Sequence, residues 1–123
     1  LGKPALGGDG DGAWRTAMRE LAAMPHVACK LSGLVTEVAG DAPDDALLQR
    51  YLDTALELFG AQRLMFGSDW PVCLLRAGYP QVHGIVARWA ERLGEAERQA
   101  LWGGTAARCY GLVAIDGGSG RWN

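Results

Sequence analysis

Apolar residues recur at spacings of three and four in three stretches of the chain, separated by polar, glycine-rich or proline-containing segments. Such spacing places apolar side chains on one face of a helix, so it predicts three amphipathic helices. Two shorter helices are expected near the C-terminal end, with Thr105 as a cap between them. The five helices are expected at about residues 13–24, 45–59, 81–93, 95–102 and 106–110. The buried face of the first is expected to consist of Trp14, Met18, Leu21 and Ala22.

Two shorter apolar stretches, residues 27–32 and 63–68, have the length and composition of strands. In the first, Cys29 and Leu31 fall on one face and Lys30 falls on the other. Strands that alternate with helices pair in parallel, which predicts an α/β fold. Two parallel strands alone leave both sheet edges open, so the pattern predicts that the complete fold contains further strands.

Composition narrows the classes of protein and of partner. The chain has 123 residues, of which 49% are hydrophobic and 21% charged, as in a globular domain rather than a disordered one. The net charge of -2 and the lack of a basic run argue against nucleic acid as a partner. The apolar runs are too short to cross a membrane. Residues 1–112 are expected to fold, and the glycine-rich segment 113–123 is expected to form a flexible tail.

The cysteines indicate a compartment rather than a disulfide or metal framework. Cys29, Cys73 and Cys109 are odd in number and far apart in sequence. A reducing compartment, the cytoplasm, is therefore expected. The chain begins without Met, which predicts a start inside a longer reading frame, with processing or tag removal as the alternative.

The sharpest chemical signal is the run Phe-Gly-Ser-Asp-Trp-Pro at the end of the second predicted strand, in which the acidic residue is Asp69. Enzymes built on α/β barrels place catalytic groups at the carboxyl ends of their strands, which makes Asp69 a candidate. Gly67 would allow a substrate or a neighbouring backbone to approach closely. The alternative is that the Asp69 side chain caps the following turn.

Lys30 is a second candidate, because it faces away from the apolar side of its strand, toward the interior or the mouth of a barrel. The alternative is a strand-end lysine whose ammonium reaches water. His26 is expected on the surface, and His83 either lines the mouth of the site or lies on the surface. Neither histidine has the paired spacing of a metal motif, so the sequence indicates no metal-ligand cluster of its own.

Three segments resemble a single family, in the order Lys30 to Leu34, Arg63 to Cys73 and Leu101 to Leu112. They are similar to the amidohydrolase-2 family of the amidohydrolase superfamily. Within it they look most like the sugar-lactone hydrolases of the L-fuconolactonase and L-rhamnonolactonase type. The Gly-Ser-Asp-Trp-Pro block is specific to the family, whereas the choice of substrate within it is less specific.

The resemblance implies a distorted (β/α)8 barrel of the TIM type, of which this chain would supply the last strands and helices. It implies that Asp69 is the general base that activates the attacking water, and that Asp69 can approach a divalent metal such as zinc in the full-length protein. Lys30, Ser32 and Trp70 are expected beside the substrate, a sugar lactone. The opening Leu-Gly-Lys-Pro is similar to the end of the family's Asp-His-Leu-Gly-Lys-Pro motif, whose histidine would precede Leu1.

Three functional hypotheses remain open at this point. The first is part of a lactonase, in which a missing N-terminal half supplies the histidines. The second is a non-catalytic module that completes a barrel-like assembly with a partner chain, or by self-association, through its open strand edges. The third is another amidohydrolase-2 chemistry, such as hydrolysis of a pyrone-dicarboxylate lactone or decarboxylation.

Overall fold

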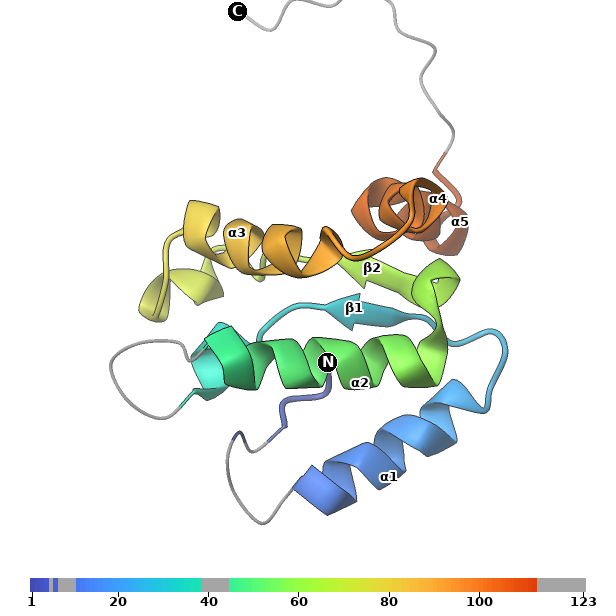
Figure 1. Ribbon diagram of the computed structural model, residues 1–123, viewed down its shortest axis with the longest axis horizontal. Coiled ribbons are helices and arrows are strands. Elements are labelled where there is room, and N and C mark those ends of the chain that lie inside the picture. The colour runs from blue at the N-terminus through green and yellow to red at the C-terminus, as the bar shows by residue number, and fades with distance from the viewer. Residues whose placement is uncertain (5, 7–10, 39–44, 113–123) are drawn as a thin grey trace, which may run out of the picture.

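Two short parallel strands lie at the centre of the protein, between helices that precede and follow them (Figure 1). The computed structural model describes residues 1–4, 6, 11–38 and 45–112, so the predicted tail 113–123 lies outside the described residues. The helices and strands are α1 (Asp11–Ala22), β1 (Cys29–Leu31), α2 (Asp45–Phe59), β2 (Leu64–Phe66), α3 (Tyr79–Ala90), α4 (Glu95–Gln99) and α5 (Thr105–Tyr110). Short 3-10 turns cover Val35–Glu37, Ala61–Arg63 and Val72–Leu75, and a π-helical turn, Ala100–Gly104, links α4 to α5. The predicted order of helices and strands is confirmed.

The strands β1 and β2 pair in parallel, as their alternation with helices predicted. The register places Cys29 opposite Leu64 and Lys30 opposite Met65. In β1 the two outer side chains are buried and Lys30 is exposed, which confirms that Lys30 faces away from the apolar side of its strand. Within the part of the chain that the structure describes, each strand has one edge without a partner strand.

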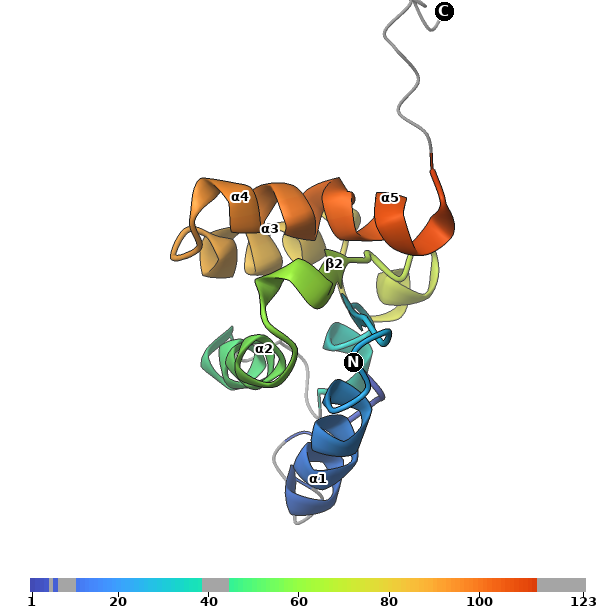
Figure 2. The ribbon, with the colours of Figure 1, turned by 90° about the vertical axis from the view of Figure 1, so that its right-hand side faces the viewer.

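The core lies between the strands and the apolar faces of α2 and α3. Figure 2 shows α2 to one side of the strands, and α3, α4 and α5 beyond β2. The helical spacing predicted the buried faces of α2 and α3, which include Leu48, Leu52, Ala55, Ile85 and Trp89. None of the described helices is both long enough and apolar enough to cross a membrane.

Helix α1 differs from its prediction in position and in buried face. It covers Asp11–Ala22 rather than about 13–24, and Leu21 is 43% exposed although it was expected to be buried. Met18 is buried as predicted. Arg63 contacts the end of the helix, because its Nη1 donates to the carbonyl oxygens of Ala22 and Met24, each at 3.0 Å. The carbonyl groups at the end of the helix thus receive hydrogen bonds from a side chain that is distant in sequence.

Thr105 is not the cap that its position between two helices predicted. It is the first residue of α5, and the backbone before it is already helical. Its side chain is 1% exposed, and its hydroxyl donates to the Gln62 carbonyl oxygen at 3.1 Å. Arg108 Nη2 donates to the same oxygen at 2.6 Å. Thr105 therefore joins α5 to the turn that precedes β2, a contact between segments far apart in sequence.

Candidate active site

The residues that carried the chemical signals lie where the two strands end, at the same edge of the sheet. Lys30 belongs to β1 and Ser32 follows it, whereas Gly67 and Asp69 follow β2. The Gly67 N–H donates to the Leu31 carbonyl oxygen at 3.2 Å, which extends the pairing one residue beyond β2. Parallel strands bring their carboxyl ends to one edge, so the fold gathers the two motifs that are separate in sequence.

Asp69 lies in a turn whose backbone is held by other groups. Its φ is 59°, in the left-handed region, and its carbonyl oxygen accepts a hydrogen bond from the Cys73 N–H at 2.9 Å. The Ser68 hydroxyl oxygen accepts a hydrogen bond from the Trp70 N–H at 3.2 Å. Among the described residues, no hydrogen bond or ion pair engages the Asp69 carboxylate. The carboxylate is therefore not the cap of this turn.

Each of the two motifs contains a glycine that faces polar side chains of the other motif. Gly33, with φ of 71°, lies so close to Asp69 that a Cβ on it would stand 3.4 Å from Asp69 Oδ2. A Cβ on Gly67 would stand 2.9 Å from Lys30 Cδ and 3.0 Å from Ser32 Cβ. The two strand ends are thus packed against each other through these glycines.

The first residue of the chain lies beside the same groups. The Leu1 α-amino group donates to the Lys30 carbonyl oxygen at 2.9 Å. Burial lowers the pKa of this amino group below its ordinary value of 8.0, and the positive charge of Lys30 lowers it further. Cys29 and the Asp69 carboxylate act in the opposite direction and raise it.

Trp70 begins an exposed apolar rim beside Asp69. Its side chain is 65% exposed, and Leu74 and Leu75 in the following turn are exposed as well. Cys73 in the same turn is fully buried and anchors it in the core.

His83 has surroundings that the sequence did not predict. Its half-buried imidazole stacks on the Trp102 ring, with centroids 4.9 Å apart, and on the Tyr79 ring, with centroids 6.1 Å apart. Phe66, the last residue of β2, meets it edge-on at 5.6 Å. The spacing of four between Tyr79 and His83 could have indicated one of these contacts, whereas the contact with Trp102 depends on the tertiary fold. His26 is exposed, as predicted.

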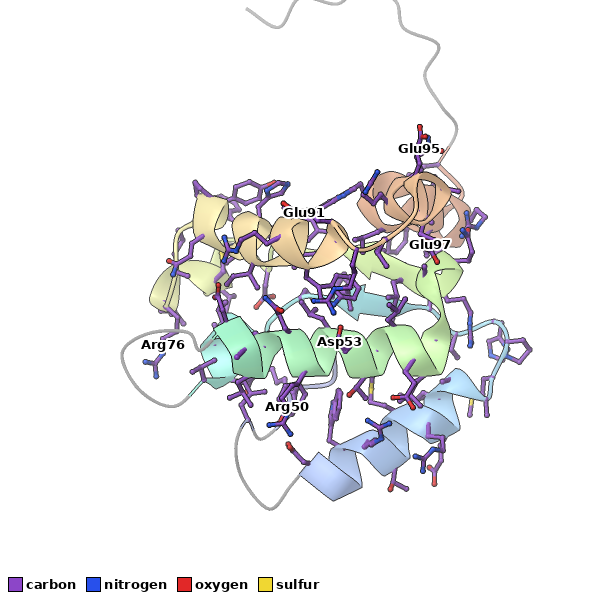
Figure 3. The ribbon with its side chains drawn as sticks, viewed as in Figure 1. Arg50, Asp53, Arg76, Glu91, Glu95 and Glu97 are labelled. Atoms are coloured by element: carbon purple, nitrogen blue, oxygen red, sulfur yellow. The ribbon has the colours of Figure 1, made fainter. Side chains whose placement is uncertain are left out.

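Several other carboxylates lie on the helices rather than at the strand ends. Figure 3 shows the side chains of Asp53 on α2, Glu91 just after α3, and Glu95 and Glu97 on α4. Asp53 Oδ1 accepts hydrogen bonds from Trp89 Nε1 and Arg92 Nη1, each at 2.8 Å. Asp53 therefore has a structural role in holding α3 to α2, unlike Asp69.

Comparison with known proteins identifies the family. Residues 1–112 match the amidohydrolase family, which covers nearly the whole chain. The chain belongs to the amidohydrolase family. This amidohydrolase chain is 61% identical over 121 residues to an L-fucono-1,5-lactonase of Burkholderia multivorans, a match that covers 90% of the chain and 41% of that lactonase. It is 43% identical over 113 residues to an L-fucono-1,5-lactonase of Burkholderia ambifaria, covering 88% of the chain and 38% of the relative.

Solved structures place the amidohydrolase chain in a larger fold. It is similar to a crystal structure of an amidohydrolase from Burkholderia multivorans with bound zinc, at a TM-score of 0.85 and 60% identity, over 91% of this chain and 42% of that one. It also shares its fold with a 2-pyrone-4,6-dicarboxylic acid hydrolase described from Pseudomonas putida, at a TM-score of 0.69 and 24% identity, over 89% and 40% of the two chains. The amidohydrolase chain thus spans about two fifths of the length of the relatives it matches. The predicted fold, part of an α/β barrel, is confirmed.

The described residues of this amidohydrolase chain do not make a metal site by themselves. They contain no group of three His, Cys, Asp or Glu side chains that could hold a metal ion. Asp69 offers one carboxylate at the strand ends, whereas a catalytic metal site takes about three protein ligands.

Proposed function

We propose that this amidohydrolase chain contributes the carboxylate base and part of the substrate-binding surface of an enzyme that hydrolyses a sugar 1,5-lactone. The observation that carries the proposal is the Asp69 carboxylate, which lies at the end of β2 and has no hydrogen-bonding partner among the described residues. A carboxylate without a structural partner is available to take a proton from water. The identity of 61% with an L-fucono-1,5-lactonase supports a sugar lactone as the substrate.

Hydrolysis of a lactone needs a base for the attacking water and a positive group near the carbonyl oxygen. Asp69 is assigned the first role: it takes one proton of the water while the water oxygen forms a bond to the carbonyl carbon. The ring C–O bond then breaks, and the ring oxygen takes up a proton and leaves as a hydroxyl. Lys30 is assigned to the substrate or its developing negative charge, Ser32 to a hydrogen bond with the substrate, and Trp70 to the apolar face of the sugar ring.

The cofactor and the rest of the site belong to the proposal as well. A divalent metal such as zinc polarises a carbonyl group when it is bound. We assign Asp69 as one of its ligands, with the other ligands contributed by segments beyond the described residues. The remaining strands of the barrel would come from the same polypeptide or from a partner chain. The cytoplasm is the compartment that the unpaired cysteines Cys29, Cys73 and Cys109 indicate.

A graft tests this assignment. Residues 1–112 would replace the segment that they match in the Burkholderia multivorans lactonase, and acid release from L-fucono-1,5-lactone would be followed. The wild-type graft is expected to hydrolyse the lactone. Asp69→Asn is expected to lower kcat by at least about 100-fold, because an amide cannot take the proton. The melting temperature of the metal-free graft by circular dichroism is expected to stay unchanged, since the carboxylate holds no other described group.

Glu91→Gln is the control, because it likewise replaces a carboxylate by an amide, but at an exposed position just after α3. It is expected to leave kcat unchanged. Near-normal turnover by the Asp69→Asn graft would contradict the role of Asp69. A folded wild-type graft that hydrolyses 2-pyrone-4,6-dicarboxylate but no sugar lactone would replace the proposed substrate class.

A further inference from the structure

We propose that Gly67 is a positioning residue that sets the direction of the Lys30 side chain, carrying its ammonium toward the strand ends where Asp69 lies. The contact between Gly67 and Lys30 stands on the geometry alone, whereas its effect on catalysis rests on the proposed function. The geometry consists of the strand register, the space above Gly67 and the backbone conformation of Gly67.

The strand register shows that the Lys30 side chain leans along the sheet. Lys30 lies opposite Met65, yet its Cγ and Cδ lie over Gly67, two residues further toward the carboxyl end of β2. Residues advance by about 3.3 Å each along a strand, so a stem that reaches the space above Gly67 leans away from Met65, toward the edge that bears Asp69. The ammonium extends beyond Cδ and is carried in that direction.

The space that the stem occupies exists because residue 67 has no side chain. A Cβ at this position would stand 2.9 Å from Lys30 Cδ, 3.0 Å from Lys30 Cγ and 3.0 Å from Ser32 Cβ. All three distances are shorter than the van der Waals separation of about 3.5–4.0 Å between carbon atoms. Alanine would therefore displace the Lys30 stem and press on Ser32.

The backbone gives no competing reason for glycine at position 67. Its φ lies outside the left-handed region, unlike that of Gly33 at 71°. Other residues could adopt the conformation of Gly67, so the need for glycine here is a need for space. The clash would fall on the middle of the Lys30 side chain, which can rotate away, and on Ser32 Cβ, which can yield only through a small shift of its backbone. Alanine is thus expected to redirect Lys30 rather than to unfold the protein.

The sequence provides a direct probe of the Lys30 side chain. The chain contains two lysines, Lys3 and Lys30, and the Lys3 side chain is 82% exposed. Reductive methylation with ¹³C-formaldehyde would give one dimethyl-lysine signal for each, with the α-amino group as a separate signal. In the 123-residue chain, Gly67→Ala is expected to move the Lys30 signal and leave the Lys3 signal in place. Gly84→Ala in α3 is the matched control, because its new Cβ would meet only the mobile end of Arg88, and it is expected to move neither signal.

Every outcome of this experiment decides the proposal. A folded Gly67→Ala chain with an unmoved Lys30 signal would overturn it. If Gly67→Ala fails to fold, the double variant Lys30→Ala/Gly67→Ala decides. Recovery of the fold on removing the Lys30 stem would support the contact, and failure in both would assign Gly67 a purely structural role. None of these readouts uses catalysis, so an inactive wild-type graft would count against the proposed function alone.

In an active graft, the effect of Gly67→Ala on catalysis can be separated from its effect on protein stability. Gly67→Ala is expected to lower kcat/KM by about 10- to 100-fold, since a shift of about 1 Å in a substrate-directed group can cost that much. Added to Lys30→Ala, the same substitution is expected to change kcat/KM little, because the group through which it acts is already gone. An equal loss in both backgrounds would contradict action through Lys30.

Discussion

At the scale of single residues, burial decides which thiols can react. Cys29 and Cys73 are buried and Cys109 is exposed. Burial raises the pKa of the Cys29 thiol above its ordinary value of 9.0, because its thiolate would lose hydration in the core, and the Leu1 α-amino group opposes this shift. The thiolate is the reactive form, so Cys29 is expected to be inert at neutral pH.

The raised pKa of Cys29 predicts a loss of stability in alkali. Above pH 9.0 the unfolded chain gives up the Cys29 proton while the folded chain keeps it. The folded state then binds more protons, so the free energy of unfolding falls as pH rises through this range. Urea unfolding at neutral pH and at several values above pH 9.0 should show a shallower fall for Cys29→Val than for the wild type. Cys109→Ser, the exposed control, should keep the wild-type dependence of the unfolding free energy on pH.

An equal dependence in the wild type and in Cys29→Val would contradict the assignment of this loss of stability to the Cys29 thiol.

The positions that the sequence predicted correctly are those that follow from a local rule. Asp69 and Lys30 could be placed at the strand ends because each belongs to a short strand pattern, and parallel strands end at one edge. The contact of Lys30 with Gly67 could not be predicted, because it depends on the register between strands. The stacking of His83 on Trp102 depends on how the C-terminal helices fold back onto β2.

At the scale of elements, local sequence patterns predicted the buried faces of α2 and α3, whereas the ends of α1 and α5 involve tertiary contacts. Helices α2 and α3 bury their apolar faces in the central core, so their spacing predicted the faces correctly. Arg63 binds the end of α1, and Gln62 binds the start of α5, through hydrogen bonds between segments far apart in sequence. Both contacts come from the turn before β2, which acts as an anchor for elements on either side of it.

If the turn before β2 anchors α5, the Thr105 hydroxyl should make a measurable contribution to the free energy of unfolding. Thr105→Val keeps the shape of the side chain but removes the bond to Gln62 and the bond that Thr105 Oγ1 accepts from Arg108 Nη2 at 3.2 Å. The Gln62 carbonyl oxygen retains its own bond from Arg108. The expected loss is about 1 kcal/mol in the free energy of unfolding, the net value of a buried hydrogen bond. Thr16→Val is the control, because its hydroxyl donates to the Gly12 carbonyl oxygen at an exposed site. Denaturant unfolding should distinguish the two, and an equal effect would contradict an anchoring role.

At the scale of the whole molecule, the two strands and their helices leave several large apolar side chains exposed to solvent. Large apolar side chains are exposed beside the strand ends and on the last helix, among them Trp70, Leu74, Leu75, Tyr110 and Leu112. Both described strands also have an unpaired edge. The relatives are more than twice as long, and a complete barrel pairs each of its strands with a neighbour on both sides. The surface therefore favours association with whatever supplies the next strands.

Association of the 123-residue chain with itself is the expected result when no other strands are present. Sedimentation velocity should show an average mass that rises above 13.1 kDa as concentration increases. Apolar contacts weaken on cooling, so the association should weaken at low temperature. It should respond little to salt, because screening acts mainly on charges. Adding the remaining segment of the Burkholderia multivorans lactonase should compete with self-association, since both would cover the same strand edges.

A constant mass of 13.1 kDa at all concentrations would show that the open strand edges do not drive self-association. Completion of the barrel within one polypeptide would then be the favoured explanation of those edges.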